Sequence, residues 1–378
     1  MLDGVHLTLL IGPLAVPTPA APPVLEALQS VQVSAQRERT GFQLTFSIGK
    51  LSPLQAMLAA GLLDPMITRV VVIATLRGLP NVICDGVVTR HDLSPSNEPG
   101  QSTLTLTGED LGVLMDVVQM QIPWPAVPDY VRVNLILAKY AMFGITPVVL
   151  PSPVVTVRSP TEGYDLQTDP DLTYIKRLAR LSGYTFYLEP GPAPLQSIAY
   201  FGPDLRIPVP QPALSVNSDW GTNVDSLSFS LDGLSKKVTV ITILDPVTRK
   251  VPISIPVPNI DILKPPLGAR LIPPSKVTFS DELANLPPDE AAKRAFGLMR
   301  EGADSVGGSG SLSVTRYGHI LKARMLVGVR GAGLAYDGMY YVEGVTHSIK
   351  RGEYKQSFTL SRDGLISQTP IVPVGVPL

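Results

Sequence analysis

The sequence contains almost no cysteine, since Cys84 is the only one in 378 residues. A lone cysteine excludes an intrachain disulfide framework, and it also excludes a zinc site built on several thiolates. Its usual role is that of a small buried hydrophobic residue. We therefore expect a chain that is made in a reducing compartment and folds without covalent cross-links.

A surplus of charge of either sign is also missing. The sequence has 31 Lys and Arg against 32 Asp and Glu, which gives a formal net charge of −1. Proteins that hold nucleic acid or anionic lipid by charge carry a basic surplus, because the phosphates must be neutralised. The balance therefore predicts that this chain does not bind nucleic acid on its own.

Long apolar runs are absent as well. No uninterrupted apolar stretch approaches the roughly 18 residues that cross a bilayer. The first basic residue is Arg37, which lies too far along the chain for the positively charged start of a secretory signal. We expect a protein that is soluble in the producing cell and does not insert stably into a membrane.

Proline, by contrast, is abundant. The 38 prolines are about twice the average share. An interior proline removes a hydrogen-bond donor and clashes with the preceding helical turn, so the chain cannot be dominated by helices. With 44% hydrophobic and 17% charged residues, the composition predicts a globular, mainly β (α+β) protein built of short strands and stiff loops.

The first part of the chain alternates between apolar and polar residues. This pattern in residues 28–50 predicts a β-hairpin around Thr40. Ser52 and Pro53 have the residue types of a helix N-cap and first turn, which predicts a short helix. We expect residues 1–114 to form a tube-like antiparallel β-barrel. Its further strands are predicted at 69–77, 81–92 and 101–107.

Residues 115–205 are predicted to form a small inserted α/β domain. Helical patterns begin just before it, at 109–118, and recur at 130–144 and, most clearly, at 171–183. The last of these has one charged face and one apolar face, and it ends at a glycine. The apolar positions are Leu172, Ile175, Leu178 and Ala179, and strands are predicted to follow at 184–189 and 196–202.

Residues 206–365 are predicted to form a second tube-like β-barrel. Within it, 246–274 contains eight prolines and is expected to be an extended arm, because prolines exclude a helix or a central strand. A helix is predicted at 288–301. The glycine-rich run 307–310 is interpreted as a flexible linker, since it lacks the Lys-Ser/Thr of a phosphate-binding loop. A Pro-rich tail, 366–378, follows. Strands are predicted at 223–232, 236–244, 322–331, 338–349 and 354–362.

Two distant stretches, 84–111 and 342–365, resemble one another. Each has an acidic residue before a glycine and a Gln-Ser pair before a Thr/Leu-rich strand. We interpret them as a repeat of one β-module, although any two amphipathic hairpins share some of this pattern. If so, the two hairpins occupy equivalent places in superimposable barrels, and a trimer imitates a six-fold ring. The matches are Asp85-Gly86-Val87 with Glu343-Gly344-Val345, and Gln101-Ser102 with Gln356-Ser357.

Three stretches carry a family resemblance. They are 171–189, the pair 85–93 and 104–111, and, most specifically, 336–364, which reads YDGMYYVEGVTHSIKRGEYKQSFTLSRDG. With them the chain resembles the phage late-control D and tail baseplate hub proteins, and the N-terminal hub portion of the valine-glycine-repeat spike proteins of type VI secretion. In 336–364 the matching residues are Asp337, Gly338, Tyr340, Val342, Val345, His347, Gly352, Tyr354, Leu360 and Arg362.

The resemblance implies a structural role in a contractile injection machine. It implies a homotrimer with two tube-like barrels per chain, seated in the baseplate between the hexameric tail tube and a central spike. Because no spike domain is included, the spike is expected to be a separate protein. Other baseplate proteins and the tape measure protein are further candidate partners, and synthesis is expected in the bacterial cytoplasm.

No set of residues predicts an enzyme, a cofactor or a metal site. The histidines are dispersed and lack metal-binding spacing, and Cys84 has no evident base partner. Neighbouring carboxylates occur where helix starts already favour them, and neighbouring tyrosines fit packing or subunit contact better than stacking on sugars. These residues are His6, His91, His319 and His347, Glu109-Asp110 and Asp281-Glu282, and Tyr336, Tyr340 and Tyr341.

Two alternatives remain open from the sequence. A tail-associated peptidoglycan hydrolase would need paired carboxylates or a zinc set. A tail-tip carbohydrate- or receptor-binding protein would need an exposed aromatic cluster, and only 6% of the residues are aromatic. The sequence does not separate a phage tail from a related extracellular injection system.

Overall fold

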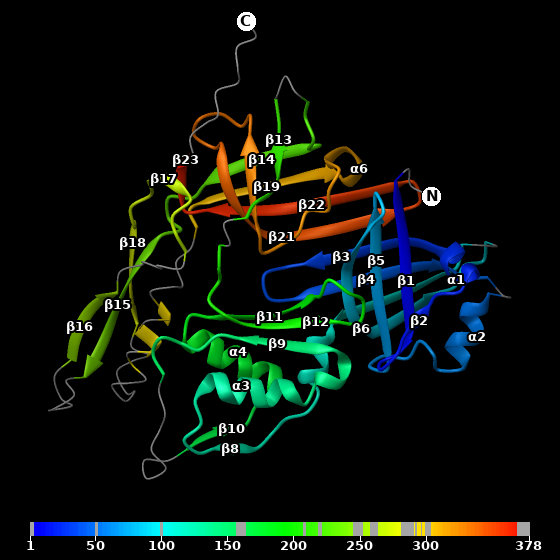
Figure 1. Cartoon of the computed structure of the whole chain (residues 1–378), viewed down its shortest axis with the longest axis horizontal. Coiled ribbons are helices and arrows are strands. Elements are labelled where there is room, and N and C mark those ends of the chain that lie inside the picture. Colours follow the sequence, from blue (N-terminus) through cyan, green and yellow to red (C-terminus); the bar gives the residue numbers. More distant parts are fainter. Residues whose placement is uncertain are drawn as a thin grey trace, which may run out of the picture. The chain divides into compact units, whose positions relative to one another are not determined.

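The computed structural model shows a mainly β protein, with 49% of the described residues in strands and 17% in helices, as the proline content predicts. The chain divides into two compact units (Figure 1). Unit 1 comprises Met1–Pro203 and Thr346–Lys355, and unit 2 comprises Asp204–Val345 and Gln356–Leu378. The residues that the structure describes are 4–49, 52–98, 101–155, 164–206, 209–217, 221–244, 252–257, 264–280, 291, 293–295, 297–298 and 304–368.

Unit 1 is built on one large sheet, with strand order β21-β3-β4-β7-β6-β5-β1-β2. Its successive pairs from β3 to β2 are antiparallel. Of β21, only the end that belongs to the hairpin tip 346–355 lies in this unit. The strands are β1 (Val5–Pro13), β2 (Thr18–Pro19), β3 (Leu28–Ala35), β4 (Thr40–Ser47), β5 (Thr68–Leu76), β6 (Leu79–Ser94) and β7 (Thr103–Asp110).

The hairpin predicted around Thr40 is confirmed as β3 and β4. The turn of this hairpin lies at 36–39, just before Thr40 and not at Thr40 itself. Thr40 is already part of strand β4, and its N–H donates to Asp110 Oδ2 at 2.8 Å. Along β4 every second side chain points into the core. Phe42, Leu44 and Phe46 are buried there, as expected for a strand with one covered face.

Helix α2 (Pro53–Ala59) confirms the short helix predicted from Ser52 and Pro53. The Ser52 hydroxyl accepts the N–H of Leu54 at 3.3 Å, which is the ordinary N-cap contact. Proline occupies the first turn, where its missing donor costs nothing. A second short helix, α1 (Pro22–Ala27), begins with two prolines for the same reason.

The two predicted tube-like β-barrels are not confirmed, because no closed barrel is found among the described strands. In unit 1 the hydrogen-bonded path stops at β2, which is two residues long and pairs only with β1. Pro17 precedes this strand, and Pro19 is its last residue. A proline cannot donate to a further ladder, so the sheet has an edge here.

The second layer of unit 1 contains its longer helices and a small sheet in the order β11-β12-β9 (Figure 1). The predicted helix at 171–183 is confirmed as α4, and its apolar face packs in a core cluster with the two strands that follow it, β11 and β12. The elements are η1 (Leu111–Met115), β8 (Ile122–Trp124), α3 (Asp129–Ala138), η2 (Ala141–Phe143), β9 (Ile145–Val149), β10 (Asp165–Gln167), α4 (Asp171–Leu181), β11 (Thr185–Pro190) and β12 (Ser197–Gly202).

The helix predicted at 109–118 is confirmed only as the short 3-10 helix Leu111–Met115. Strand β7 continues through Asp110, and only a short 3-10 helix follows. Gly108 explains the extension, because a Cβ there would lie 2.2 Å from the Phe42 ring and 2.3 Å from the Val87 carbonyl oxygen. The glycine lets β7 pass close to its neighbours, and this tertiary contact overrides the local helical pattern.

Unit 2 contains a sheet in the order β14-β19-β22-β21-β20-β13, a second sheet β16-β15-β18 and the pair β17-β23. Helix α6 (Val314–Tyr317) follows β19. The strands are β13 (Gln211–Ser215), β14 (Ser226–Leu231), β15 (Lys237–Leu244), β16 (Pro252–Val257), β17 (Gly268–Leu271), β18 (Lys276–Ser280), β19 (Val306–Ser313), β20 (Leu326–Arg330), β21 (Gly338–Lys350), β22 (Glu353–Arg362) and β23 (Gly364–Ser367).

The interpretation of 307–310 as a flexible linker is wrong, because these residues lie in strand β19, paired with β14. The glycines make room for aromatic rings. A Cβ on Gly308 would lie 2.9 Å from the Phe229 ring, and one on Gly310 would lie 2.7 Å from the Phe358 ring. A run that is flexible in isolation is therefore held as a strand by its neighbours.

The Pro-rich segment 246–274 contributes strands where it is described. Strand β16 lies at the edge of its three-stranded sheet, as prolines require, and β17 pairs with β23. Within the predicted helix 288–301, the described residues (291, 293–295, 297 and 298) are helical, and the others lie outside the described residues, as does most of the predicted tail 366–378. None of the described helices is long and apolar enough to cross a bilayer.

Candidate functional site

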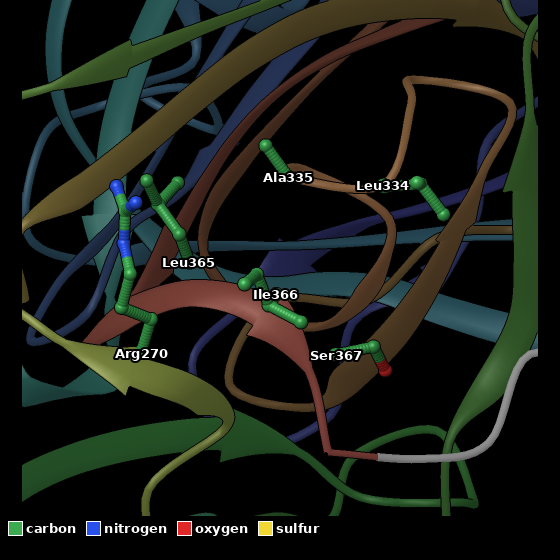
Figure 2. Close-up of a pocket in the computed structure, with 6 residues that line it drawn as sticks. All are labelled: Arg270, Leu334, Ala335, Leu365, Ile366 and Ser367. Atoms are coloured by element: carbon green, nitrogen blue, oxygen red, sulfur yellow. The ribbon is translucent and has the colours of Figure 1, made fainter.

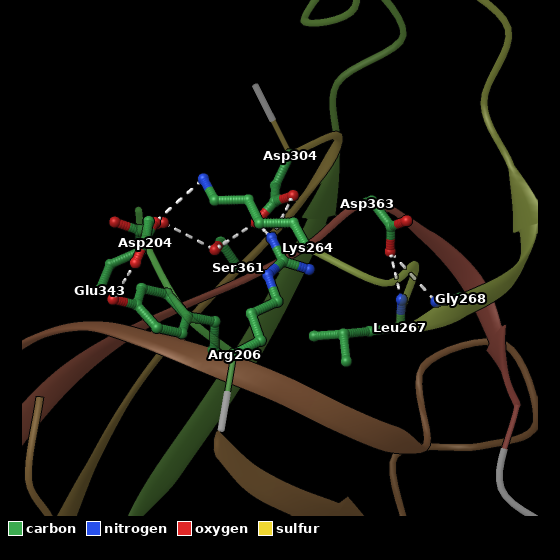
Figure 3. Close-up of polar contacts among 10 residues, drawn as sticks. Asp204, Arg206, Lys264, Leu267, Gly268, Asp304, Glu343, Ser361 and Asp363 are labelled. Carbon is green, nitrogen blue, oxygen red and sulfur yellow. Dashed lines mark hydrogen bonds and ion pairs between the residues drawn. The ribbon is translucent and has the colours of Figure 1, made fainter. Parts of the chain in front are cut away.

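A buried cluster of charged side chains holds unit 2 together (Figure 3). Arg206 donates to both carboxylate oxygens of Asp304, at 2.8 and 2.7 Å. The Ser361 hydroxyl on β22 lies 2.6 Å from Asp304 and 2.7 Å from Glu343 of β21. Burial alone would lower the pKa of Arg206, but the nearby carboxylates, led by Asp304, outweigh it and raise the pKa. Arg206 therefore stays charged.

The same cluster fastens the end of the Pro-rich segment (Figure 3). Lys264 Nζ lies 3.0 Å from Asp204, and Asp204 also accepts the Tyr341 hydroxyl at 2.7 Å. The Asp363 carboxylate accepts the backbone N–H groups of 267 and 268, at 2.8 and 3.1 Å. These contacts join the chain before β17 to residues of β21 and to the turn after β22.

The contacts of this cluster join segments of unit 2 to one another. Its two ion pairs, Arg206–Asp304 and Lys264–Asp204, join side chains that are 13% exposed or less. A general acid or base needs a proton that it can exchange with a substrate within hydrogen-bond reach. Here the charged groups are directed at one another, so the arrangement restricts movement of the segments that it joins.

An apolar pocket of about 370 Å³ lies in unit 2 beside strand β23 (Figure 2). One wall is the loop residues Leu334 and Ala335, and the other is the last strand. Neither its shape nor its lining was predicted from the sequence. Its lining residues are Arg270, Leu334, Ala335, Leu365, Ile366 and Ser367.

Unit 1 contains a buried ion pair that the sequence reasoning missed. Arg69 on β5 donates from Nε and Nη2 to the two carboxylate oxygens of Asp85 on β6, each at 2.7 Å. The two side chains are 1% and 0% exposed. A signal was present, because each charged residue stands inside an otherwise apolar strand, where it must be paired to be buried.

The structure keeps the four histidines apart. His6 and His319 are exposed, and His91 Nδ1 lies 3.4 Å from the Leu63 carbonyl oxygen. His347 is buried on β21, with Nδ1 2.8 Å from the Tyr354 hydroxyl. Over the described part of the chain, no group of three or more His, Cys, Asp or Glu side chains is arranged to hold a metal ion.

Burial lowers the pKa of His347 to about 3, from 6.5. Between these values the unfolded chain binds a proton that the folded chain does not, so stability is present above pH 6.5 and is lost as the pH falls. We expect the unfolding free energy to fall more steeply below pH 6.5 than in His347→Gln, by roughly 1.4 kcal/mol per pH unit. Urea unfolding at pH 7 and pH 5 measures this. The exposed His319→Gln is the control, and equal slopes in all three proteins would contradict the prediction.

Cys84 and the neighbouring carboxylates have structural surroundings. Cys84 is buried, and its pKa is raised by burial and then by Asp85 and Asp110, which disfavours the reactive thiolate. Asp110 accepts the N–H of Gly112 at 2.9 Å, as the N-cap of η1. Glu109 lies 3.5 Å from Arg39 at the surface. The candidate pair Asp281-Glu282 lies outside the described residues.

The neighbouring tyrosines of β21 point into unit 2. Tyr340 and Tyr341 are 0% and 3% exposed, so their rings are unavailable to a sugar. Tyr336 stacks on Phe229 with ring centroids 5.3 Å apart. Arg362 lies 4.5 Å from the centre of the Tyr340 ring, a cation–π contact. These rings form the packing around the end of β22.

Solved structures similar to this chain include tail proteins and a component of the type VI secretion system. The crystal structure of a tail protein from Neisseria meningitidis MC58 has a TM-score of 0.58 at 14% identity, covering 96% of this chain and 98% of that one. The prophage MuSo2 43 kDa tail protein from Shewanella oneidensis has a TM-score of 0.62 at 11% identity, covering 96% and 99%.

A third similar structure comes from type VI secretion. The E. coli c3393 protein, described as a component of that system with structural similarity to the T4 phage tail proteins gp27 and gp5, has a TM-score of 0.52 at 13% identity and covers 91% of this chain and 76% of that one. No protein-family model and no curated protein matches the sequence. The predicted resemblance to phage tail and type VI secretion proteins is confirmed for the fold.

Proposed function

We propose that the chain is a structural hub protein in the baseplate of a phage tail or a related contractile injection machine. One observation carries the proposal: the likeness to two tail proteins, one of them from a prophage, extends over 96% of this chain and nearly all of theirs. A similarity of that extent covers the whole fold and not a single shared module. In the proposal the chain is a homotrimer that joins the hexameric tail tube to a separate central spike.

The two meanders support the idea of duplicated modules. Strands β5, β6 and β7 are consecutive antiparallel neighbours, and β20, β21 and β22 are neighbours in the same order. In each meander the last two strands, β6–β7 and β21–β22, form the hairpin of the interpreted repeat. In the proposal the first module is 1–114, the insertion 115–205 and the second module 206–365, and two like modules in each of three chains meet a six-fold tube.

Each unit contains buried ion pairs that restrict movement, as expected for a protein that transmits force. Unit 1 has the buried pair Arg69–Asp85 and unit 2 the buried cluster around Arg206. Large apolar side chains also remain exposed, and obligate partners cover such surfaces. Examples are Leu135 at 53%, Met142 at 76%, Val277 at 59% and Phe279 at 74% exposed. Tube, spike and other baseplate proteins are the proposed partners, with the tape measure protein a further candidate.

Light scattering of the purified chain tests the assembly. We expect a mass of about three times the 40.5 kDa of one chain, with an interface of obligate size, on the order of several thousand Å² per pair. A map of the assembled particle should show three copies around the spike. A stable monomer at every concentration, together with six copies in the particle, would contradict the proposal.

The hydrolase alternative has its own test. A zymogram on peptidoglycan should show no cleared band for the purified chain. A band that disappears when a single Asp or Glu is replaced would establish the enzyme instead. For the receptor-binding alternative, binding of host-cell polysaccharide by the purified chain is the decisive outcome.

A further inference from the structure

The apolar pocket of unit 2 is an open hollow of about 370 Å³ beside β23 (Figure 2). Leu334 on its loop wall is 74% exposed, and Ile366 on its strand wall is 44% exposed. Ala335 and Leu365 continue the apolar lining. Single exposed leucines are ordinary on protein surfaces, but apolar side chains gathered around a hollow mark a binding site.

The walls of the hollow are held in place by specific contacts. Arg362 donates to the carbonyl oxygens of Ala335 and Asp337, both at 2.9 Å, and the Ile366 N–H donates to the Ala335 carbonyl at 2.9 Å. Ile366 has a φ of 64°, a left-handed conformation that a β-branched residue rarely adopts and that persists where the surroundings impose it. The hollow is therefore preformed, so little free energy is lost to ordering its walls when a ligand enters.

A positive charge stands at one wall of the hollow. Arg270 of β17 lies directly opposite Leu365 of β23 in their antiparallel pair, and its side chain lies alongside Leu365 (Figure 2). Within the described part of the chain, no carboxylate forms an ion pair with Arg270. Asp337 and Asp363, which flank the pocket residues in the sequence, accept backbone N–H groups instead, at 2.7 and 2.8 Å. The guanidinium is therefore available to a carboxylate of a ligand.

The open shape of the hollow selects the kind of ligand. A small molecule is usually held in a site that buries most of its surface. Here Leu334 and Ile366 stand exposed at the rim, and a small molecule inside the hollow would leave them in water. A protein surface that inserts one side chain covers the rim as well. An arginine beside an apolar pocket is also typical of protein interfaces.

We propose that this hollow is a docking site for a partner protein that inserts a large apolar side chain between Leu334 and Ile366 and places a neighbouring carboxylate against Arg270. The inserted side chain removes the apolar rim from water, and the carboxylate pairs with the guanidinium. The inference rests on the hollow and on the charge beside it, and it does not depend on the proposed hub role.

Binding of short synthetic peptides tests both halves of the site in the full chain. The probe is acetyl-Gly-Ser-Glu-Phe-Ser-Gly-amide, and two matched peptides carry glutamine in place of the glutamate or serine in place of the phenylalanine. In an NMR titration we expect the probe to bind with a Kd on the order of 1 mM. Each matched peptide should bind at least about fivefold more weakly. Equal binding of the three peptides, or no binding of the probe at about 10 mM, would overturn the proposal.

Variants of the chain locate the binding. Leu334→Asp should weaken binding of the probe at least about tenfold. Arg270→Glu should reverse the preference, so that a peptide with lysine in place of the glutamate binds better than the probe. Leu234→Asp is the matched control, since Leu234 is 72% exposed in the same unit, and it should leave binding unchanged. Circular dichroism verifies that each variant is folded. If Arg270→Glu does not reverse the preference, the recognition of a carboxylate is wrong.

Two other occupants of the hollow give different results. Octanoate is an apolar carboxylate without a peptide chain. If it binds as tightly as the probe and is lost in Leu334→Asp, the site serves a small molecule and the proposal is overturned. If light scattering shows an oligomer that Leu334→Asp dissociates and Leu234→Asp does not, a second copy of the chain fills the hollow, which also overturns the proposal.

Discussion

Replacing Asp85 with asparagine is expected to lower the free energy of unfolding by roughly 3–5 kcal/mol. The change leaves the Arg69 guanidinium without its carboxylate partner at a site where the arginine side chain is 1% exposed. Asparagine keeps the size of the side chain, so the loss reports the unpaired charge rather than a cavity. Chemical denaturation of the wild-type and variant chains measures the difference.

The exposed pair Arg90–Asp92 provides the matched control. Its side chains are 72% and 43% exposed, although its closest N–O distance is also 2.7 Å. Asp92→Asn should cost no more than about 1 kcal/mol, because solvent screens an exposed pair. The double variant Arg69→Met, Asp85→Leu should recover much of the lost stability. If Asp85→Asn costs no more than Asp92→Asn, the assignment of the buried pair is wrong.

Arg362→Met is expected to cost about 3 kcal/mol or more, since the carbonyl oxygens of Asp337 and Ala335 each lose the donor that Arg362 supplies. Arg362 is 0% exposed, donates to Asp337 and Ala335 and lies against the Tyr340 ring. Burial lowers its pKa, yet the backbone carbonyls and the ring compensate the buried charge. Chemical denaturation followed by circular dichroism measures the loss.

Two further variants separate the role of Arg362 from a general effect of charge. Arg330→Met removes an exposed arginine of β20 and should change stability by less than about 0.5 kcal/mol. Arg362→Lys should recover only part of the loss, because an ammonium lacks the planar fork that reaches both carbonyls. Wild-type stability in Arg362→Met would contradict the prediction.

The sequence predicted the elements whose pattern is local. Helix α4 was recognised from its apolar face, α2 from Ser52 and Pro53, and the hairpins from their alternation. Strand β19 was missed because its glycines have a low strand propensity of their own, and they form a strand through pairing with β14 and packing against Phe229 and Phe358. Whether a sheet closes into a barrel depends on pairing between edge strands that are far apart in the sequence. The predicted barrels therefore had no local pattern to support them.

The sites were less predictable than the elements, for the same reason. Arg206 and Asp304 are 98 residues apart in the sequence, and nothing near either residue indicates the other. Arg362 was singled out as part of the family pattern, but its hydrogen bonds to backbone carbonyls leave no trace in the sequence. Arg69 and Asp85 could have been found, because a charge inside an apolar strand requires a partner.

The glycines of β19 also bear on how the protein folds. A strand this poor in side chains cannot start a sheet, so it must join one whose aromatic rings are already in place. Its partner β14 is far away in the sequence, with Ser226 and Ser311 85 residues apart where they pair. Contacts of such long range are slow to form, because the loop must close before they stabilise anything. We expect this edge of unit 2 to be acquired late in folding, and its slow completion to set the rate at which assembly-competent chains accumulate.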